Sequence, residues 1–167
     1  LGAFRRIEGK RYIDGYCGVG SFGLEALSRG AAHCVFIESD RPVRQYLERN
    51  IAHTRLGDNA VIRSTDIGRA FNDIQKSANR FDVIVLDPPF PVSNAWLDAT
   101  TAPDPSAAKT DRSMNASIAA FETAYRTAFD IVRPSGMVVL RIESRNLPSF
   151  QPPDGFHLET RRYGRNT

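Results

Sequence analysis

The chain has 167 residues, enough for one domain with a sizeable core that needs neither disulfides nor metals. Its content of 41% hydrophobic and 25% charged residues is ordinary for a soluble globular protein, and no stretch approaches a transmembrane span or a secretory signal. The formal net charge of +3 suits a polyanionic partner only weakly, because mildly basic proteins are common.

The first informative segment runs from a short strand into a glycine-rich turn and a helix. We predict the strand over residues 11–16 (RYIDGY), which contains Asp14, and the helix over residues 22–28. Between and within them three glycines stand in a GxGxxG arrangement: Gly18, Gly20 and Gly23. Glycines at this spacing permit a tight turn, let the backbone approach a ligand and let the helix pack on the strand. The segment therefore predicts a nucleotide-binding turn.

The second strand is predicted over residues 33–39 (HCVFIES) and carries an acid near its end. That acid, Glu38, lies twenty positions after Gly18, the spacing at which an acidic residue in a βαβ unit reaches ribose hydroxyls. The alternative is an acid at a helix N-terminus, the role we expect for Asp40 before a helix over 41–52. Spacing and position at the strand end favour the ribose role for Glu38.

The third strand is predicted over residues 59–64 (NAVIRS), with Asp66 directly after it. A carboxylate there suits the exocyclic amine of an adenine. It suits equally well the cap of a helix over 67–78. The sequence pattern does not choose between the two.

The fourth strand, Phe81–Leu86, is a nearly continuous apolar run of the kind buried on both faces of a parallel sheet. It is followed by Asp87, two prolines that cannot continue the ladder, and Phe90. The lone pair of an exocyclic amine is delocalised into its base, so an enzyme that methylates it must orient the amine and accept its hydrogens. The Asp87 carboxylate and the backbone carbonyl of Pro88 suit that task, and Phe90 suits stacking on the base.

The rest of the chain is predicted to be a polar loop, a helix and two strands. Residues 91–116 lack sustained periodicity, and we expect a substrate-facing lid, with Trp96 packing down as an anchor, or a disordered loop. A helical apolar pattern covers 117–132, and strands are predicted over 137–142 and 156–163. Alternating strands and helices predict a single three-layer α/β domain with a mostly parallel sheet.

The candidate site residues all follow the carboxyl ends of predicted strands, where open parallel sheets bind ligands. A dinucleotide dehydrogenase would share the glycine turn and Glu38 but has no use for an acid, two prolines and an aromatic after the fourth strand. A methyltransferase can use these residues to orient its acceptor amine. Cys17 and Cys34 have no metal-ligand spacing and are too few for a disulfide scaffold, so we expect both to be reduced, buried and inert.

The run DGYCGVGSFGLEALSRGAAHCVFIESDR, followed by FDVIVLDPPF, resembles the RsmD family of S-adenosylmethionine-dependent methyltransferases, which act on the exocyclic N2 amine of a guanine in 16S ribosomal RNA. The resemblance is most specific in GLEALSRGA. It implies a Rossmann-like fold with a seven-stranded sheet and an antiparallel C-terminal hairpin, S-adenosylmethionine as cofactor, and ribosomal RNA or a small-subunit assembly particle as partner. It further implies that Asp14, Gly18 and Gly20 line the cofactor, Glu38 holds its ribose, Asp66 its adenine, and Asp87, Pro88 and Phe90 the target base.

Three departures from the family pattern stand out. Residues 1–10 lack the expected arginine-containing helix, 91–116 is longer than the usual connection, and the end RRYGRNT resembles the start of a hairpin whose last strand is missing.

The alternative functions are an adenine-N6 or glutamine-N5 methyltransferase, which more often carries asparagine at position 87, and a catalytically silent RNA-binding domain. We expect a cytoplasmic monomer without a metal or membrane partner, although a chain that begins with Leu1 says little about targeting.

Overall fold

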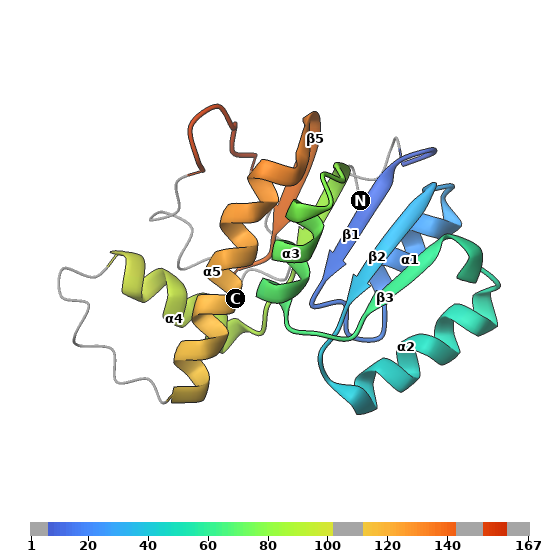
Figure 1. Ribbon diagram of the computed structural model, residues 1–167, viewed down its shortest axis with the longest axis horizontal. Coiled ribbons are helices and arrows are strands. Elements are labelled where there is room, and N and C mark those ends of the chain that lie inside the picture. Colours follow the sequence, from blue (N-terminus) through green and yellow to red (C-terminus); the bar gives the residue numbers. More distant parts are fainter. Residues whose placement is uncertain (1–6, 102–111, 143–151, 160–167) are drawn as a thin grey trace, which may run out of the picture.

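The computed structural model describes residues 7–101, 112–142 and 152–159, and within them it contains one five-stranded sheet in the order β3-β2-β1-β4-β5, with every strand parallel to its neighbours (Figure 1). The strands are β1 (Arg11–Gly15), β2 (His33–Ile37), β3 (Ala60–Arg63), β4 (Phe81–Leu86) and β5 (Val132–Leu140). The helices are α1 (Ser21–Ser28), α2 (Arg41–Thr54), α3 (Ile67–Lys76), α4 (Phe90–Thr101) and α5 (Arg112–Ile131), with a short 3-10 helix at Gly57–Asn59.

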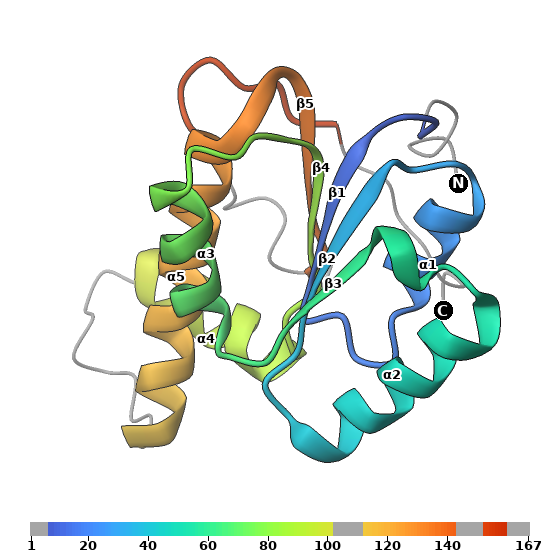
Figure 2. The same ribbon diagram turned by 45° about the vertical axis from the view of Figure 1, so that its right-hand side comes forward.

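Helices cover both faces of the sheet, which gives the predicted three layers. Figure 2 shows α1 and α2 on one side of the sheet and α3 and α5 on the other. Side chains of the central strands alternate between the two faces. On β1, Tyr12 is buried in the core under α1 and α2, whereas Ile13 is buried in the core under α3 and α5. Burial on both faces explains the continuous apolar run of β4.

The order of the strands creates a switch point between β1 and β4. From β1 the chain moves outward through β2 to β3, and then returns to place β4 on the other side of β1. Gly15 pairs with Leu86, so both strands end at the same level. In open parallel sheets a crevice forms outside the carboxyl ends at such a point, and ligands bind there.

The predicted antiparallel hairpin is wrong for the described residues. β5 runs parallel to β4, with Leu86 opposite Leu140, and residues 156–159 form no strand. The remainder of the predicted final strand, 160–163, lies outside the described residues. β5 also begins earlier than predicted, at Val132, because a register shift between Phe81 and Val83 lets the strand accommodate the segment that we predicted as a turn.

The predicted loop over 91–116 is wrong at both ends, which are helical: 91–101 belongs to α4 and 112–116 to α5. The part between them lies outside the described residues. Pro91 is the second residue of α4, where a missing backbone N–H costs nothing. Trp96 packs down as expected, because its ring centroid lies 5.1 Å from that of Phe121 and 4.9 Å from that of Tyr125.

Two smaller expectations are confirmed. Asp40 caps α2, since its Oδ1 accepts the backbone N–H of Val43 at 2.8 Å. Cys17 and Cys34 are free and buried. In the described part of the chain, no helix combines the length and the hydropathy that crossing a membrane requires.

Candidate active site

A pocket of about 920 Å³ opens at the carboxyl end of the sheet, at the switch point. It is bounded by the ends of the strands, the start of α3, the turn before α4 and one side of α5. The polar and rigid residues that line it include Tyr16, Glu38, Asp66, Asp87, Pro88 and Arg141. The structure therefore brings four of the predicted site residues, namely Glu38, Asp66, Asp87 and Pro88, to one cavity.

The glycine turn has the shape that its spacing predicts. Gly18 and Gly20 adopt positive φ angles of 55° and 89°, which favour glycine. Gly23 is required for a different reason: a Cβ there would lie 2.7 Å from Sγ of Cys34 and would also collide with the ring of Phe36. The first two glycines thus form the turn, and the third lets α1 pack against β2.

Asp14 lies beneath this turn and is not among the residues that line the pocket. Its side chain is 1% exposed, and its Oδ2 accepts the backbone N–H of Gly23 at 2.8 Å. Its Oδ1 has no hydrogen-bond partner in the described part of the chain. Burial raises the pKa of Asp14 to about 7; the Gly23 hydrogen bond opposes this shift and the charge of Asp87 adds to it. Asp14 therefore fixes the start of α1, and its predicted contact with the cofactor stays a prediction.

Glu38 joins the glycine turn to the end of β2. Its Oε2 accepts the backbone N–H of Gly18 at 3.0 Å and its Oε1 accepts that of Asp40 at 2.8 Å. An ionised carboxylate offers about four acceptor positions, so these two bonds leave room for two hydroxyl donors. The geometry is compatible with the predicted ribose contact.

Asp66 is a helix cap that also lines the pocket. Its Oδ1 accepts the backbone N–H of Arg69 at 3.0 Å, and its Oδ2 lies 3.4 Å from Nε of the same residue. The cap interpretation is confirmed. The contact with an adenine amine stays a prediction, which the half-exposed position of the carboxylate leaves open.

The proline corner places Asp87 next to the end of β1. Its backbone N–H donates to the carbonyl of Gly15 at 3.3 Å, and its side chain, 20% exposed, receives a hydrogen bond from Arg141 at 2.9 Å. The carbonyl of Pro89 accepts the backbone N–H groups of Val92 and Ser93, whereas no backbone N–H in the described segments donates to the carbonyl of Pro88. Phe90 is the first residue of α4, and its side chain lies outside the described part.

Two pocket residues were missed by the sequence analysis. Tyr16, directly after β1, has a φ of 60°, which is rare for a residue with a Cβ and often marks a functional site. Arg141 follows β5, whose end was predicted two residues too late. One helix face was missed too, and its signal was present: small residues spaced three and four apart line the pocket from α5, namely Ser113, Ala116, Ser117 and Ala120.

The chain is similar to known methyltransferases in sequence and in fold. A family model described as "Conserved hypothetical protein 95" matches residues 2–103. The chain belongs to this family. The resemblance to the RsmD family is confirmed as well, because the relatives with similar sequences include ribosomal RNA small subunit methyltransferase D of Escherichia coli strain K12, which is 37% identical over 78 residues, 47% of this chain and 37% of that protein.

A second relative is named for the large ribosomal subunit. Ribosomal RNA large subunit methyltransferase I of Photobacterium profundum is 30% identical over 88 residues, 52% of this chain and 22% of that protein. Among solved structures, a SAM-dependent methyltransferase from Agrobacterium tumefaciens has a TM-score of 0.59 at 12% identity, covering 86% of this chain and 41% of that one, and shows the fold alone. The chain spans less than half the length of these two curated relatives.

Proposed function

We propose that this chain carries the active site of an S-adenosylmethionine-dependent methyltransferase that modifies the N2 amine of a guanine in small-subunit ribosomal RNA in the cytoplasm. The observation that carries the proposal is that Asp87 and Glu38 face one pocket from the two sides of the switch point. An acid suited to a ribose and an acid suited to an amine thus share a cavity.

The pocket fits the cofactor. Its volume of about 920 Å³ lies within the range of small-molecule sites. Gly18 and Gly20 do not line the pocket themselves, but the turn is hydrogen-bonded to Glu38, which does, and the free acceptor positions of Glu38 suit a nucleoside that carries ribose hydroxyls. When bound, S-adenosylmethionine supplies an electrophilic methyl group on a sulfonium. In this proposal Glu38 binds the ribose hydroxyls and Asp66 accepts from the adenine amine.

The acceptor half of the pocket orients the amine. Asp87 and the carbonyl of Pro88 accept its two hydrogens, which directs the nitrogen lone pair out of the base plane and into the cavity. Methyl transfer would break the methyl–sulfur bond as the new N–C bond forms, leaving a neutral thioether and a cationic amine nitrogen. The carboxylate of Asp87 stabilises that charge and is placed to take a proton from the nitrogen. The prolines hold the acceptors rigid, so little reorganisation is needed during transfer.

The substrate class is supported by the names of the relatives. Both curated relatives are ribosomal RNA methyltransferases, one of the small and one of the large subunit. The choice of guanine N2 and of the small subunit depends on the resemblance around GLEALSRGA, which lies within the matched family region.

The proposal is tested with labelled S-adenosylmethionine and two acceptors, 30S particles that lack the modification and 50S particles. Wild-type protein is expected to label the 30S particles, and nucleoside digestion to yield N2-methylguanosine. Asp87→Ala is expected to abolish transfer while binding of S-adenosylhomocysteine by calorimetry persists. Glu122→Gln, a partly exposed acid of α5 that pairs with Arg126 and does not line the pocket, is the control and is expected to keep full activity.

Other outcomes identify the alternatives. Labelled N6-methyladenosine or labelled protein would replace the guanine assignment with an adenine-N6 or glutamine-N5 activity. RNA binding without any cofactor binding would indicate a catalytically silent domain. Transfer that persists in Asp87→Ala would overturn the role assigned to Asp87.

A further inference from the structure

The ion pair between Asp87 and Arg141 is built by the register of the sheet. Leu86 on β4 lies opposite Leu140 on β5, so the residues directly after each strand, Asp87 and Arg141, lie next to each other. The backbone N–H of Arg141 donates to the carbonyl of Leu86 at 3.0 Å, and its Nη1 donates to Oδ2 of Asp87 at 2.9 Å. Arg141 is therefore held at both its backbone and its guanidinium.

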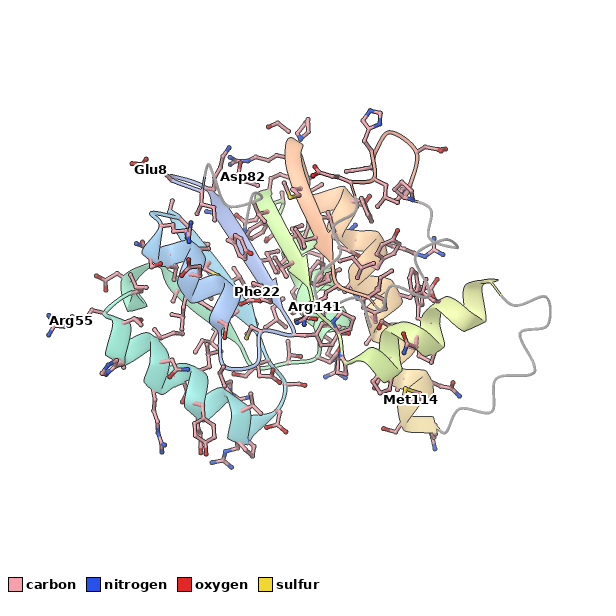
Figure 3. All side chains as sticks on the ribbon, turned by 180° about the vertical axis from the view of Figure 1, so that it is seen from behind. Glu8, Phe22, Arg55, Asp82, Met114 and Arg141 are labelled. Atoms are coloured by element: carbon pink, nitrogen blue, oxygen red, sulfur yellow. The ribbon has the colours of Figure 1, made fainter. Side chains whose placement is uncertain are left out.

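Arg141 supplies the positive charge of the pocket. Among the described residues that line the pocket, Arg141 alone has a basic side chain, whereas three have acidic side chains. Figure 3 shows it at the carboxyl end of the sheet, far from the start of β4, where Asp82 is labelled. The second nearby carboxyl group, Asp14, is buried and interacts unfavourably with the charge of Asp87. Arg141 places a positive charge beside Asp87, with its Nη1 2.9 Å from Oδ2.

The pair leaves one half of the Asp87 carboxylate available. Arg141 binds Oδ2, whereas Oδ1 makes no hydrogen bond with any of the described residues. A carboxylate that follows a strand and precedes two prolines has a fixed backbone but a side chain that still rotates. A single charge-assisted hydrogen bond to one oxygen removes that freedom.

We propose that Arg141 is a positioning residue that fixes the Asp87 carboxylate through Oδ2, so that Oδ1 points into the pocket and accepts the amine of the target base. This inference rests on the proposed function. Arg141 touches neither cofactor nor target in this role; it acts through Asp87.

A rival role predicts different kinetics. A guanidinium is a planar group with N–H donors, and the guanine edge that carries N1–H and the N2 amine is similar. If Arg141 occupied the Asp87 oxygen that accepts the base, it would compete with the substrate. Removal of the Arg141 side chain would then lower the KM for RNA. In the positioning role, removal lowers kcat, because a misplaced acceptor affects the transfer step and not the docking of RNA or cofactor.

The experiment compares Arg141→Ala and Arg141→Lys with Arg126→Ala, an arginine of α5 that is 75% exposed and pairs with Glu122 away from the pocket. Melting temperature and S-adenosylhomocysteine affinity are measured first, to show that each variant folds and binds cofactor. Arg141→Ala is expected to lower kcat about 10- to 100-fold with KM for RNA within about twofold. Arg141→Lys is expected to recover part of the loss, and Arg126→Ala to match the wild type.

An unchanged kcat in Arg141→Ala, with KM lowered or raised, would overturn the inference and leave the proposed function standing. A lowered KM would show that Arg141 occupies a position from which RNA displaces it. A raised KM would show that Arg141 contacts the RNA directly. A wild-type protein that methylates neither particle would overturn both the proposed function and this inference.

Discussion

The backbone N–H of Gly23 donates to Oδ2 of Asp14 at 2.8 Å, and this bond ties the end of β1 to the first turn of α1. It is the one hydrogen bond found for that carboxylate among the described residues, because Oδ1 has no partner there. A buried carboxylate with half of its acceptors unused is expensive when ionised. The glycine turn that Asp14 holds is therefore coupled to pH.

The first prediction concerns the pH dependence of stability at Asp14. Burial raises its pKa to about 7, whereas an unfolded aspartate titrates near pH 4. Between these values the folded protein keeps a proton that the unfolded chain releases, so this contribution is complete below about pH 4 and is lost as pH rises through about 7. Asp14→Asn keeps an acceptor for Gly23 but cannot ionise. We expect it to lose less free energy of unfolding than the wild type between about pH 5 and about pH 8.

Urea denaturation at the two pH values measures this difference. Asp58→Asn is the matched control, because Asp58 is an exposed acid on the short 3-10 helix. It is expected to follow the wild-type pH profile. An Asp14→Asn profile parallel to that of the wild type would show that Asp14 does not titrate in this range.

The second prediction concerns the packing of α1 on β2. A Cβ at Gly23 would collide with Phe36 and would lie 2.7 Å from Sγ of Cys34, both of which are fully buried. Neither neighbour has space to move, so we expect Gly23→Ala to lower the free energy of unfolding by about 1–3 kcal/mol. Gly57→Ala is the control, since a Cβ there meets only Ile51 at 3.7 Å. Equal stability of the two variants would contradict the packing role of Gly23.

The sequence was most informative where a local pattern and its chemistry coincide. The run FDVIVL predicts β4 with its observed bounds, because burial on both faces requires an uninterrupted apolar strand. The spacing of Gly18 and Glu38 predicts a ribose-binding acid beside the glycine turn, and in the structure Glu38 lies at that turn, where its carboxylate accepts the backbone N–H of Gly18. Both are properties of a βαβ unit whose geometry is local.

The sequence was least informative where tertiary packing decides. Residues 91–101 of α4 were predicted as loop because their sequence shows no sustained helical periodicity, yet Val92, Trp96 and Leu97 are buried in the core. Arg141 was missed because its role depends on the register between β4 and β5, two strands separated by both α4 and α5. No spacing along the chain encodes that pairing.

The third prediction concerns an ion network at the amino end of the sheet. The Asp82 side chain is 5% exposed; it accepts the backbone N–H of Arg11 at 2.9 Å and lies 3.3 Å from both Nζ of Lys10 and Nη1 of Arg133. Burial alone would raise the pKa of Asp82, but the Arg11 hydrogen bond and the two cations together lower it. The ionised form therefore stabilises the fold above about pH 4, and this contribution is lost as pH falls through the lowered pKa.

Asp82→Ala removes the carboxylate and leaves the N–H of Arg11 without that acceptor. We expect the free energy of unfolding at neutral pH to fall by about 1–3 kcal/mol. Glu122→Gln, which breaks an exposed pair on α5, is expected to change it by less than about 0.5 kcal/mol. A loss in Asp82→Ala as small as in the control would show that the network adds nothing to stability.

The fourth prediction concerns the cofactor affinity conferred by Glu38. Its two oxygens hold the N–H groups of Gly18 and Asp40 and leave acceptor positions toward the pocket. Glu38→Gln exchanges one acceptor oxygen for a donor, so it loses either a hydrogen bond from a backbone N–H or a contact with the ribose. We expect the Kd for S-adenosylhomocysteine, measured by calorimetry, to rise at least about tenfold. Glu48→Gln on α2, where the carboxylate is 56% exposed and 3.9 Å from Nε of Arg44, is expected to bind like the wild type. Wild-type affinity in Glu38→Gln would remove Glu38 from the cofactor site and leave it the structural role of holding the glycine turn.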